Sequence, residues 1–109
     1  MTDPDTVLLC YCTCPNADSA QLLAHALVSE SLAACVNRIP AVHATYRWNG
    51  EVTTDSEELL LIKTTAARFE ALKEHVLALH PYELPELIAV PVACGHAAYL
   101  DWVRRAGHD

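Results

Sequence analysis

The spacing of apolar and polar residues divides this chain of 109 residues into extended and helical segments. Residues 7–13 and 59–64 are apolar on both faces, which is typical of strands in the middle of a covered sheet. Residues 35–39 and 42–48 predict further extended structure, interrupted by Pro40. We therefore expect a sheet whose two most apolar strands lie at its centre.

The pair Asn49-Gly50 predicts a hairpin with a type I′ turn, because this turn requires positive φ at both central residues. In the resulting register, Tyr46 and Trp48 share one face near the tip. The alternation slips over residues 54–58, where a β-bulge is expected.

Two segments have the spacing of amphipathic helices, the first from Asn16 to about Ala34 and the second over residues 65–79. Asn16 is a favoured N-cap residue. Each helix is expected to pack one face against the sheet. The residues on these faces are Ala20, Leu23, Leu27 and Ala34 in the first helix and Phe69, Leu72, Val76 and Leu79 in the second.

A stiff connector, His80-Pro81-Tyr82-Glu83-Leu84-Pro85-Glu86, follows the second helix. Proline fixes φ and lacks an amide proton, and each proline pushes the residue before it towards extended geometry. One interpretation is that the connector only ends a helix and starts a strand at a fixed angle. The other is that it also holds His80, Tyr82, Glu83 and Glu86 in a defined constellation.

A fourth strand is expected over residues 86–94, and Pro91 within it argues for the edge of the sheet. A short helix is expected over residues 97–105. This order, with two right-handed crossovers, predicts the ferredoxin-like α+β fold, a βαββαβ arrangement with a four-stranded antiparallel sheet. The length suits a single domain over residues 1–109, with a flexible N-terminus at residues 1–6.

Composition narrows the range of functions. The chain has 14 acidic and 7 basic residues, and its net charge of −7 argues against nucleic-acid binding. No apolar run approaches the ~20 residues of a membrane span, and the N-terminus lacks the features of a signal peptide. Five cysteines are an odd number and are expected to be reduced thiols. These features predict a cytoplasmic protein that contacts no membrane.

The hairpin over residues 42–64 is longer than a lone domain needs, and it carries aromatic residues at its tip. An isolated two-stranded ribbon is marginally stable, and exposed edges and aromatic tips favour a partner. We therefore expect a homo-oligomer in which the hairpin packs on a neighbouring copy. The alternative is a hairpin that curls onto its own sheet.

Cysteine and histidine are the strongest candidates for chemistry. Cys10, Cys12 and Cys14 share one face of a strand, but residues two apart on a strand lie about 6.6–6.8 Å apart. Two thiolates on one tetrahedral zinc need sulfurs within about 4 Å, so neighbours in this trio are not expected to chelate one ion. His80, fixed by the following proline, is the better ligand candidate. The usual catalytic motifs are absent, so no enzyme activity is expected.

Six segments, taken in order, resemble the CutA divalent-cation tolerance protein family over nearly the whole chain. They are Cys12-Thr13-Cys14-Pro15, Leu32-Ala33-Ala34-Cys35-Val36, Tyr46-x-Trp48-x-Gly50, Leu61-Ile62-Lys63-Thr64, His80-Pro81-Tyr82-Glu83-x-Pro85-Glu86 and Tyr99-Leu100-x-Trp102. The resemblance implies the ferredoxin-like fold, assembled as a cytosolic homotrimer similar to PII signalling proteins. It also implies a role in tolerance of copper and other divalent ions.

The resemblance further implies a copper site built from a first-strand cysteine and the histidine before Pro-Tyr, here Cys12 and His80. Some members have a second histidine where this chain has Leu79, which removes one ligand. His75 replaces a cysteine found in some second helices and can still ligate, and Cys35 keeps the cysteine position after the first helix. Thiolate and imidazole together suit copper, as Cu⁺ or Cu²⁺, or zinc.

The sequence leaves two functions open. In the first, Cys12 and His80 bind a metal ion, with Cys14 and Cys35 as secondary ligands, and the protein responds to that ion. In the second, a PII-like trimer binds a small molecule or a partner protein in the clefts between its subunits. The residues that matter most in this second function are Tyr82, Glu83, Glu86, Trp48 and Lys63.

Overall fold

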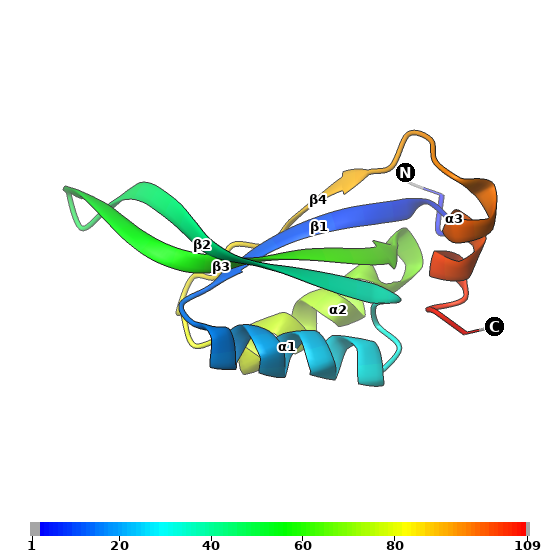
Figure 1. Ribbon diagram of the computed structural model, residues 1–109, viewed down its shortest axis with the longest axis horizontal. Helices are drawn as coiled ribbons and strands as arrows, with labels where there is room; N and C mark the ends of the chain where they lie inside the picture. The colour runs from blue at the N-terminus through cyan, green and yellow to red at the C-terminus, as the bar shows by residue number, and fades with distance from the viewer. Residues whose placement is uncertain (1–2, 109) are drawn as a thin grey trace.

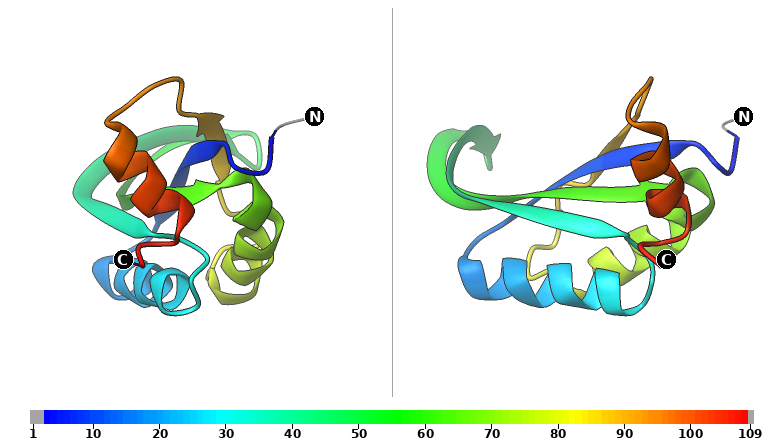
Figure 2. Two further views of the ribbon diagram at one scale, coloured as in Figure 1. Left: turned by 90° about the vertical axis from the view of Figure 1, so that its right-hand side faces the viewer. Right: turned by 45° about the vertical axis from the view of Figure 1, so that its right-hand side comes forward.

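A four-stranded antiparallel sheet carries two helices on one face and a shorter helix at one end of the other face (Figures 1 and 2). The computed structural model describes residues 3–108. Its elements are β1 (Val7–Cys14), α1 (Ala17–Ser29), β2 (Cys35–Trp48), β3 (Glu51–Thr65), α2 (Ala66–Leu79), β4 (Ile88–Pro91) and α3 (Ala97–Arg104). The strand order β2-β3-β1-β4 confirms the ferredoxin-like α+β fold, with the first and third strands central.

The main core lies between the sheet and the helices α1 and α2. β1 and β3 point alternate side chains towards these helices, and the predicted inner faces of both helices meet them. The fully buried members are Cys10, Cys12, Cys14, Ala20, Leu27, Leu60, Ile62, Leu72 and Val76. Leu79 was expected on this inner face but is 41% exposed, and the next residue, His80, is buried instead. Ala34 was also expected on the inner face of the first helix, but it lies beyond the end of α1. It belongs instead to a smaller cluster with Val7 and Val103, against which α3 packs on the opposite face of the sheet.

Helix α1 ends at Ser29, five residues before the predicted end at Ala34. The Ser31 N–H donates to the carbonyl of Val28, and the Leu32 N–H donates to that of Leu27. These two bonds form a Schellman motif, with Ser31 at a φ of 58° in the position where glycine is usual. No glycine marks this end of the helix, so the sequence pattern predicted an end that lies too far along the chain.

Strand β4 lies at the sheet edge, as Pro91 indicated, but it is much shorter than residues 86–94. It pairs with β1 from Ile88 opposite Tyr11 to Pro91 opposite Leu8. One further bond continues the pairing beyond the strand, because the Val92 N–H donates to the carbonyl of Val7, the first residue of β1, at 2.9 Å.

The hairpin turn has the predicted geometry, since Asn49 and Gly50 have φ of 50° and 81°. The bulge, however, lies in β2 between Ile39 and Val42, and not at residues 54–58. One extra residue is inserted there, and Ala41 has a φ of 60°. Because side chains alternate along a strand, this insertion moves every later residue of β2 to the opposite face.

The outer half of the hairpin extends beyond the rest of the sheet (Figure 1). β1 pairs with β3 from Thr65 only as far as Glu58, so residues 51–57 pair with β2 alone. At the tip, Trp48 is 49% exposed and Val52 is 65% exposed. The predicted packing of this hairpin on a neighbouring copy stays a prediction.

The N-terminal segment contacts the start of α2. The carbonyls of Thr6 and Pro4 accept the N–H groups of Ala66 and Ala67 at 2.9 and 3.0 Å. The predicted flexibility of residues 1–6 falls partly on residues 1 and 2, which lie outside the described residues. Within residues 3–108, no helix has the length and apolar character needed to cross a membrane.

Candidate metal centre and adjoining groove

The sheet points three thiols at the helices. Cys10, Cys12 and Cys14 occupy alternate positions of β1, as predicted, and all three are fully buried. Cys14 closes the strand, opposite Glu58 of β3. The Cys14 thiol therefore lies at the C-terminal end of β1, shortly before α1 begins.

His80 reaches this point from the other side of the core. It caps the C-terminus of α2 and has the extended backbone, with φ of −73° and ψ of 137°, that the following proline favours. Its Nδ1 accepts the N–H of Tyr82 at 3.1 Å, and its Nε2 lies 2.7 Å from the carbonyl oxygen of Thr13. A backbone N–H can only donate, so these bonds assign the ring proton to Nε2, which donates to Thr13.

One ligand atom from each of Cys12, Cys14 and His80 lies within 4.8 Å of the others, and all three residues are buried. The two sulfurs approach more closely than the spacing of the strand predicts, because that spacing describes the backbone and the thiols extend beyond it. The bound of 4.8 Å is still wider than the roughly 4 Å that two ligands of one tetrahedral zinc need, so the expectation that neighbouring thiols do not chelate one ion stays a prediction. Cys14, a secondary candidate in the sequence, belongs to the same cluster as Cys12 and His80.

The two thiols of the cluster differ in acidity. The interaction of Cys12 with the neighbouring Cys14 sulfur raises the pKa of Cys12, and burial raises it further. The same interaction lowers the pKa of Cys14, because a nearby S–H group stabilises its thiolate. The hydrogen bond that the structure gives the Cys12 thiol goes to the carbonyl of Thr13, at 3.9 Å. Since thiolates and not thiols ligate metals, Cys14 reaches the binding form before Cys12.

The donor set fits a soft metal ion. Two thiols and an imidazole suit Cu⁺ or Zn²⁺, and a buried site of this kind lacks the oxygen ligands that harder ions prefer. Both ring nitrogens of His80 are hydrogen-bonded, so an ion that binds the ring must displace one of these bonds. Cys12, Cys14 and His80 are the residues that would hold such an ion.

Two secondary candidates lie elsewhere among the described residues. Cys35 starts β2 opposite Lys63, whose Nζ is 3.9 Å from its sulfur. Because Cys14 lies opposite Glu58, Cys35 is separated from this end of the cluster by about a third of the length of β3. His75 lies one and a half turns before His80 on α2 and is not part of the cluster.

A groove opens on the face of the sheet opposite the thiols. It has a volume of about 700 Å³ and lies between the outer hairpin and the connector after α2. Four of the five residues expected to serve a small-molecule site line it, namely Trp48, Tyr82, Glu83 and Glu86. The fifth, Lys63, does not, and its ammonium group contacts Asn37 on β2 instead.

The bulge at Ala41 creates one wall of this groove. Beyond it, Val42 pairs with Glu57, and Tyr46 pairs with Thr53, so even-numbered residues of β2 share the face of Glu57. Without the extra residue, Tyr46 would face the other side of the sheet. Glu57, which the sequence analysis did not single out, forms the floor and accepts a hydrogen bond from the Tyr82 hydroxyl at 2.8 Å.

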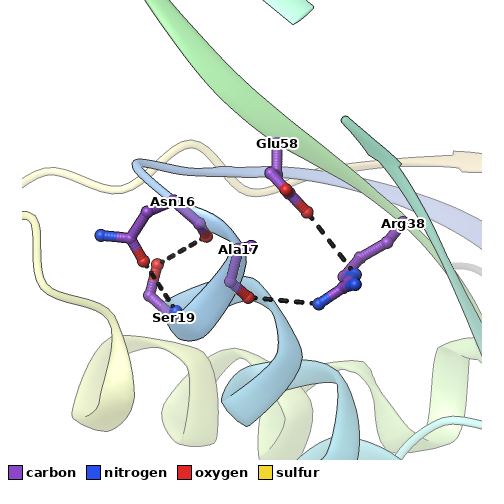
Figure 3. Close-up of polar contacts among 5 residues, drawn as sticks. All are labelled: Asn16, Ala17, Ser19, Arg38 and Glu58. Carbon is purple, nitrogen blue, oxygen red and sulfur yellow. Dashed lines mark hydrogen bonds and ion pairs between the residues drawn. The ribbon is translucent and has the colours of Figure 1, made fainter. Parts of the chain in front are cut away.

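Arg38 of β2 connects Glu58 of β3 with the first turn of α1 (Figure 3). Its Nε lies 3.5 Å from Oε1 of Glu58, and its Nη1 donates to the carbonyl of Ala17 at 3.2 Å. Asn16 caps the same turn, as predicted, by accepting a backbone N–H. Because Glu58 lies opposite Cys14, this network fixes the end of β1 that carries the thiols.

The fold and the site define a ferredoxin-like α+β protein with a buried thiol and imidazole cluster next to an acidic, aromatic groove. A family model described as CutA1 divalent ion tolerance protein matches residues 8–106. The chain therefore belongs to the CutA1 divalent ion tolerance protein family, as the six sequence segments indicated. This is not a family of enzymes, in agreement with the sequence analysis.

Relatives and solved structures agree with this assignment. The divalent-cation tolerance protein CutA of Thermus thermophilus is 54% identical over 92 residues, which are 84% of this chain and 89% of that protein. Its solved structure has a TM-score of 0.90 at 49% identity and covers 94% of this chain and 99% of that one. CutA of Xylella fastidiosa has a TM-score of 0.91 at 45% identity, with the same coverage.

Other relatives are longer or carry different location names. Human Protein CutA is 45% identical over 102 residues, which are 94% of this chain but 57% of the human protein. The CutA proteins of Oryza sativa and Arabidopsis thaliana are named chloroplastic, and that of Archaeoglobus fulgidus is named periplasmic. Compartment therefore varies among the proteins that this chain resembles.

Proposed function

We propose that this protein binds copper through Cys12 and His80, with Cys14 as a third ligand, and contributes to metal-ion tolerance in the cytoplasm as a homotrimer. The observation that carries this proposal is the buried approach of these three ligand atoms to within 4.8 Å. The family name supports the divalent-ion role, and the soft donors favour copper among such ions.

An anaerobic titration with Cu⁺ against a chromogenic chelator tests the metal site. We expect the unchanged protein to bind one ion per chain and the double variant Cys12→Ala, His80→Ala to lose this binding. Cys10→Ala is the matched control, because it removes an equally buried thiol from the same strand face but outside the cluster. Equal affinity in the double variant would leave only adventitious coordination at the surface.

The assembly and the compartment are separate parts of the proposal. The outer hairpin, with its exposed aromatic tip and its strand pairs that lack a third strand, supports packing against neighbouring copies. Sedimentation at several concentrations tests the trimer, and a single monomeric species would reject it. Five free cysteines support a reducing compartment, and localisation of a tagged full-length protein tests this.

A second candidate function is a PII-like module that binds a small molecule. The groove beside the cluster favours it, because its volume of about 700 Å³ lies in the usual range for ligand sites. The two functions separate in a thermal-shift experiment with copper and with small metabolites. A melting increase with an organic ligand, and none with copper, supports the second function over the first.

A further inference from the structure

Both ring nitrogens of His80 take part in hydrogen bonds within the protein. Nδ1 accepts the Tyr82 N–H at 3.1 Å, and Nε2 donates to the carbonyl of Thr13 at 2.7 Å. A neutral imidazole has one proton and one lone pair, so these two bonds use the whole hydrogen-bonding capacity of the ring. Because His80 is only 8% exposed, a change at either nitrogen has to be accommodated by the neighbouring protein groups.

Ligation of a metal ion by this ring removes the bond to Tyr82, whichever nitrogen is used. If Nδ1 ligates, it gives up the lone pair that accepts the Tyr82 N–H. If Nε2 ligates, the neutral ring carries its proton on Nδ1. Nδ1 and the Tyr82 N–H are then both donors and cannot pair with each other. The Tyr82 N–H therefore loses its acceptor in either case.

Tyr82 connects His80 with the hairpin. Its ring lies beside the His80 ring, with the two centroids 5.0 Å apart, and its hydroxyl donates to Oε2 of Glu57 at 2.8 Å. An N–H that stays buried without a partner is unfavourable, and Tyr82 is 38% exposed, so its N–H can turn towards water. Such a turn of the backbone moves the Tyr82 ring and draws its hydroxyl away from Glu57.

Glu57 lies where the outer hairpin extends beyond the rest of the sheet. It pairs with Val42, directly after the bulge, whereas β1 accompanies β3 only as far as Glu58. Glu57 is 7% exposed, and its described hydrogen bond comes from Tyr82. The connection from His80 to the base of the hairpin runs through hydrogen bonds within one chain. It needs no open groove, so it is compatible with packing of the hairpin on a neighbouring copy.

We propose that ligation of a metal ion by His80 releases Tyr82 and breaks the hydrogen bond between Tyr82 and Glu57 at the base of the outer hairpin. The proposal rests on the proposed metal-binding function and adds its regulation, because occupancy of the buried centre changes the conformation of the connector after α2. Coupling between two equilibria is reciprocal, so the bond between Tyr82 and Glu57 also opposes metal binding.

NMR of the nitrogen-15-labelled protein, with and without saturating Cu⁺, tests the release of Tyr82. Cu⁺ is diamagnetic, so the His80 ring nitrogens and the Tyr82 amide stay observable. Without copper, we expect the ring proton on Nε2 and a Tyr82 amide that is protected from hydrogen exchange. With copper, we expect the ring nitrogens to shift and the Tyr82 amide to shift and lose its protection. A Tyr82 amide that keeps its shift and protection while His80 ligates the ion overturns the proposal.

Tyr82→Phe tests the reciprocal effect, since it removes the hydroxyl that donates to Glu57 but keeps the aromatic ring. Because this bond is present before metal binding and lost after it, we expect Tyr82→Phe to bind Cu⁺ about threefold to tenfold more tightly than the unchanged protein. Tyr46→Phe is the matched control, because the Tyr46 hydroxyl donates to another carboxylate, that of Asp55, within the outer hairpin. Its affinity should be unchanged. Unchanged or weaker binding by Tyr82→Phe, or an equal gain in both variants, overturns the proposal.

Failure of this proposal and failure of the metal-binding function give different results. If Cu⁺ leaves the ring nitrogens of His80 unchanged and the double variant Cys12→Ala, His80→Ala keeps its affinity, the metal site itself is wrong and the coupling is wrong with it. If the ring nitrogens respond to Cu⁺ but neither the Tyr82 amide nor the affinity of Tyr82→Phe changes, the metal site stands and only the coupling is wrong.

Discussion

Burial and hydrogen bonding give five chemically identical thiols three different environments. Cys94 is exposed and Cys35 is half-buried, whereas the three cysteines of β1 are fully buried. Of these three, Cys12 and Cys14 shift each other's pKa in opposite directions, whereas burial alone raises the pKa of Cys10. On the same strand, Cys10 is thus a residue of the core, whereas Cys12 and Cys14 are candidate metal ligands.

The titration of Cys10 makes the stability of the metal-free protein dependent on pH. Burial raises the pKa of this thiol from 9.0 to about 11. Its proton is held more tightly in the folded state, so the stabilisation is complete below pH 9.0 and is lost as pH rises towards 11. We expect the unfolding free energy, measured by urea titration, to fall over this range, and to fall less in Cys10→Ala. The control Cys94→Ala should retain the full dependence, and an unchanged slope in Cys10→Ala would contradict the assignment.

At the scale of elements, two residues with positive φ decide how helix and strand are placed. Ser31 ends α1 in a Schellman motif, and Ala41 forms the bulge that turns the outer part of β2 over. Neither residue is a glycine, so each holds a backbone conformation that its Cβ disfavours. The surrounding tertiary contacts must therefore stabilise both positions.

Replacing Ser31 by glycine relieves strain at the end of α1. We expect Ser31→Gly to raise the unfolding free energy by about 0.5–1 kcal/mol, because the relief of the left-handed conformation exceeds the entropic cost of glycine. Ser29→Gly is the control within the last helical turn and should lower stability by about 0.5–1 kcal/mol. Urea unfolding of both variants provides the measurement. A similar destabilisation in both would show that Ser31 carries no strain.

At the scale of the whole molecule, the protein is elongated because the outer half of its hairpin extends beyond the other two strands of the sheet. The principal extents are 44, 27 and 23 Å, and the outer hairpin forms the long end (Figure 1). Both edges of the sheet, β2 and β4, lack a further strand within the described chain. Such a shape is typical of a subunit that buries its projecting parts in an assembly.

If the hairpin is an assembly element, stability depends on protein concentration. We expect the melting temperature to rise with concentration, because association of folded subunits shifts the folding equilibrium. Val52→Lys at the tip should remove this dependence and give a monomer. Leu22→Lys on α1 is the control, since Leu22 is similarly exposed, at 62% against 65%. A melting temperature independent of concentration in the unchanged protein would argue against the assembly.

The sequence alone determined those features that depend on nearby residues. Asn49-Gly50 specified its turn and Asn16 its helix cap. The apolar periodicity identified the inner face of each helix, except at the C-terminal positions Ala34 and Leu79. These features follow from backbone geometry and solvent exposure within a few residues. The order of such elements was enough to predict the ferredoxin-like fold, because few topologies satisfy the handedness rule. The thiols of β1 and the histidine before Pro81 were identified as candidate ligands for the same local reasons.

Only the tertiary structure decided which of these residues meet. The end of α1, the bulge at Ala41 and the burial of Glu57 depend on contacts between distant segments, and no local pattern marks them. The approach of His80 to Cys12 and Cys14 has the same origin, since α2 and β1 are brought together by their shared core. Sequence periodicity predicts only the face of an element on which a residue lies. Tertiary packing decides which side chains on that face come into contact.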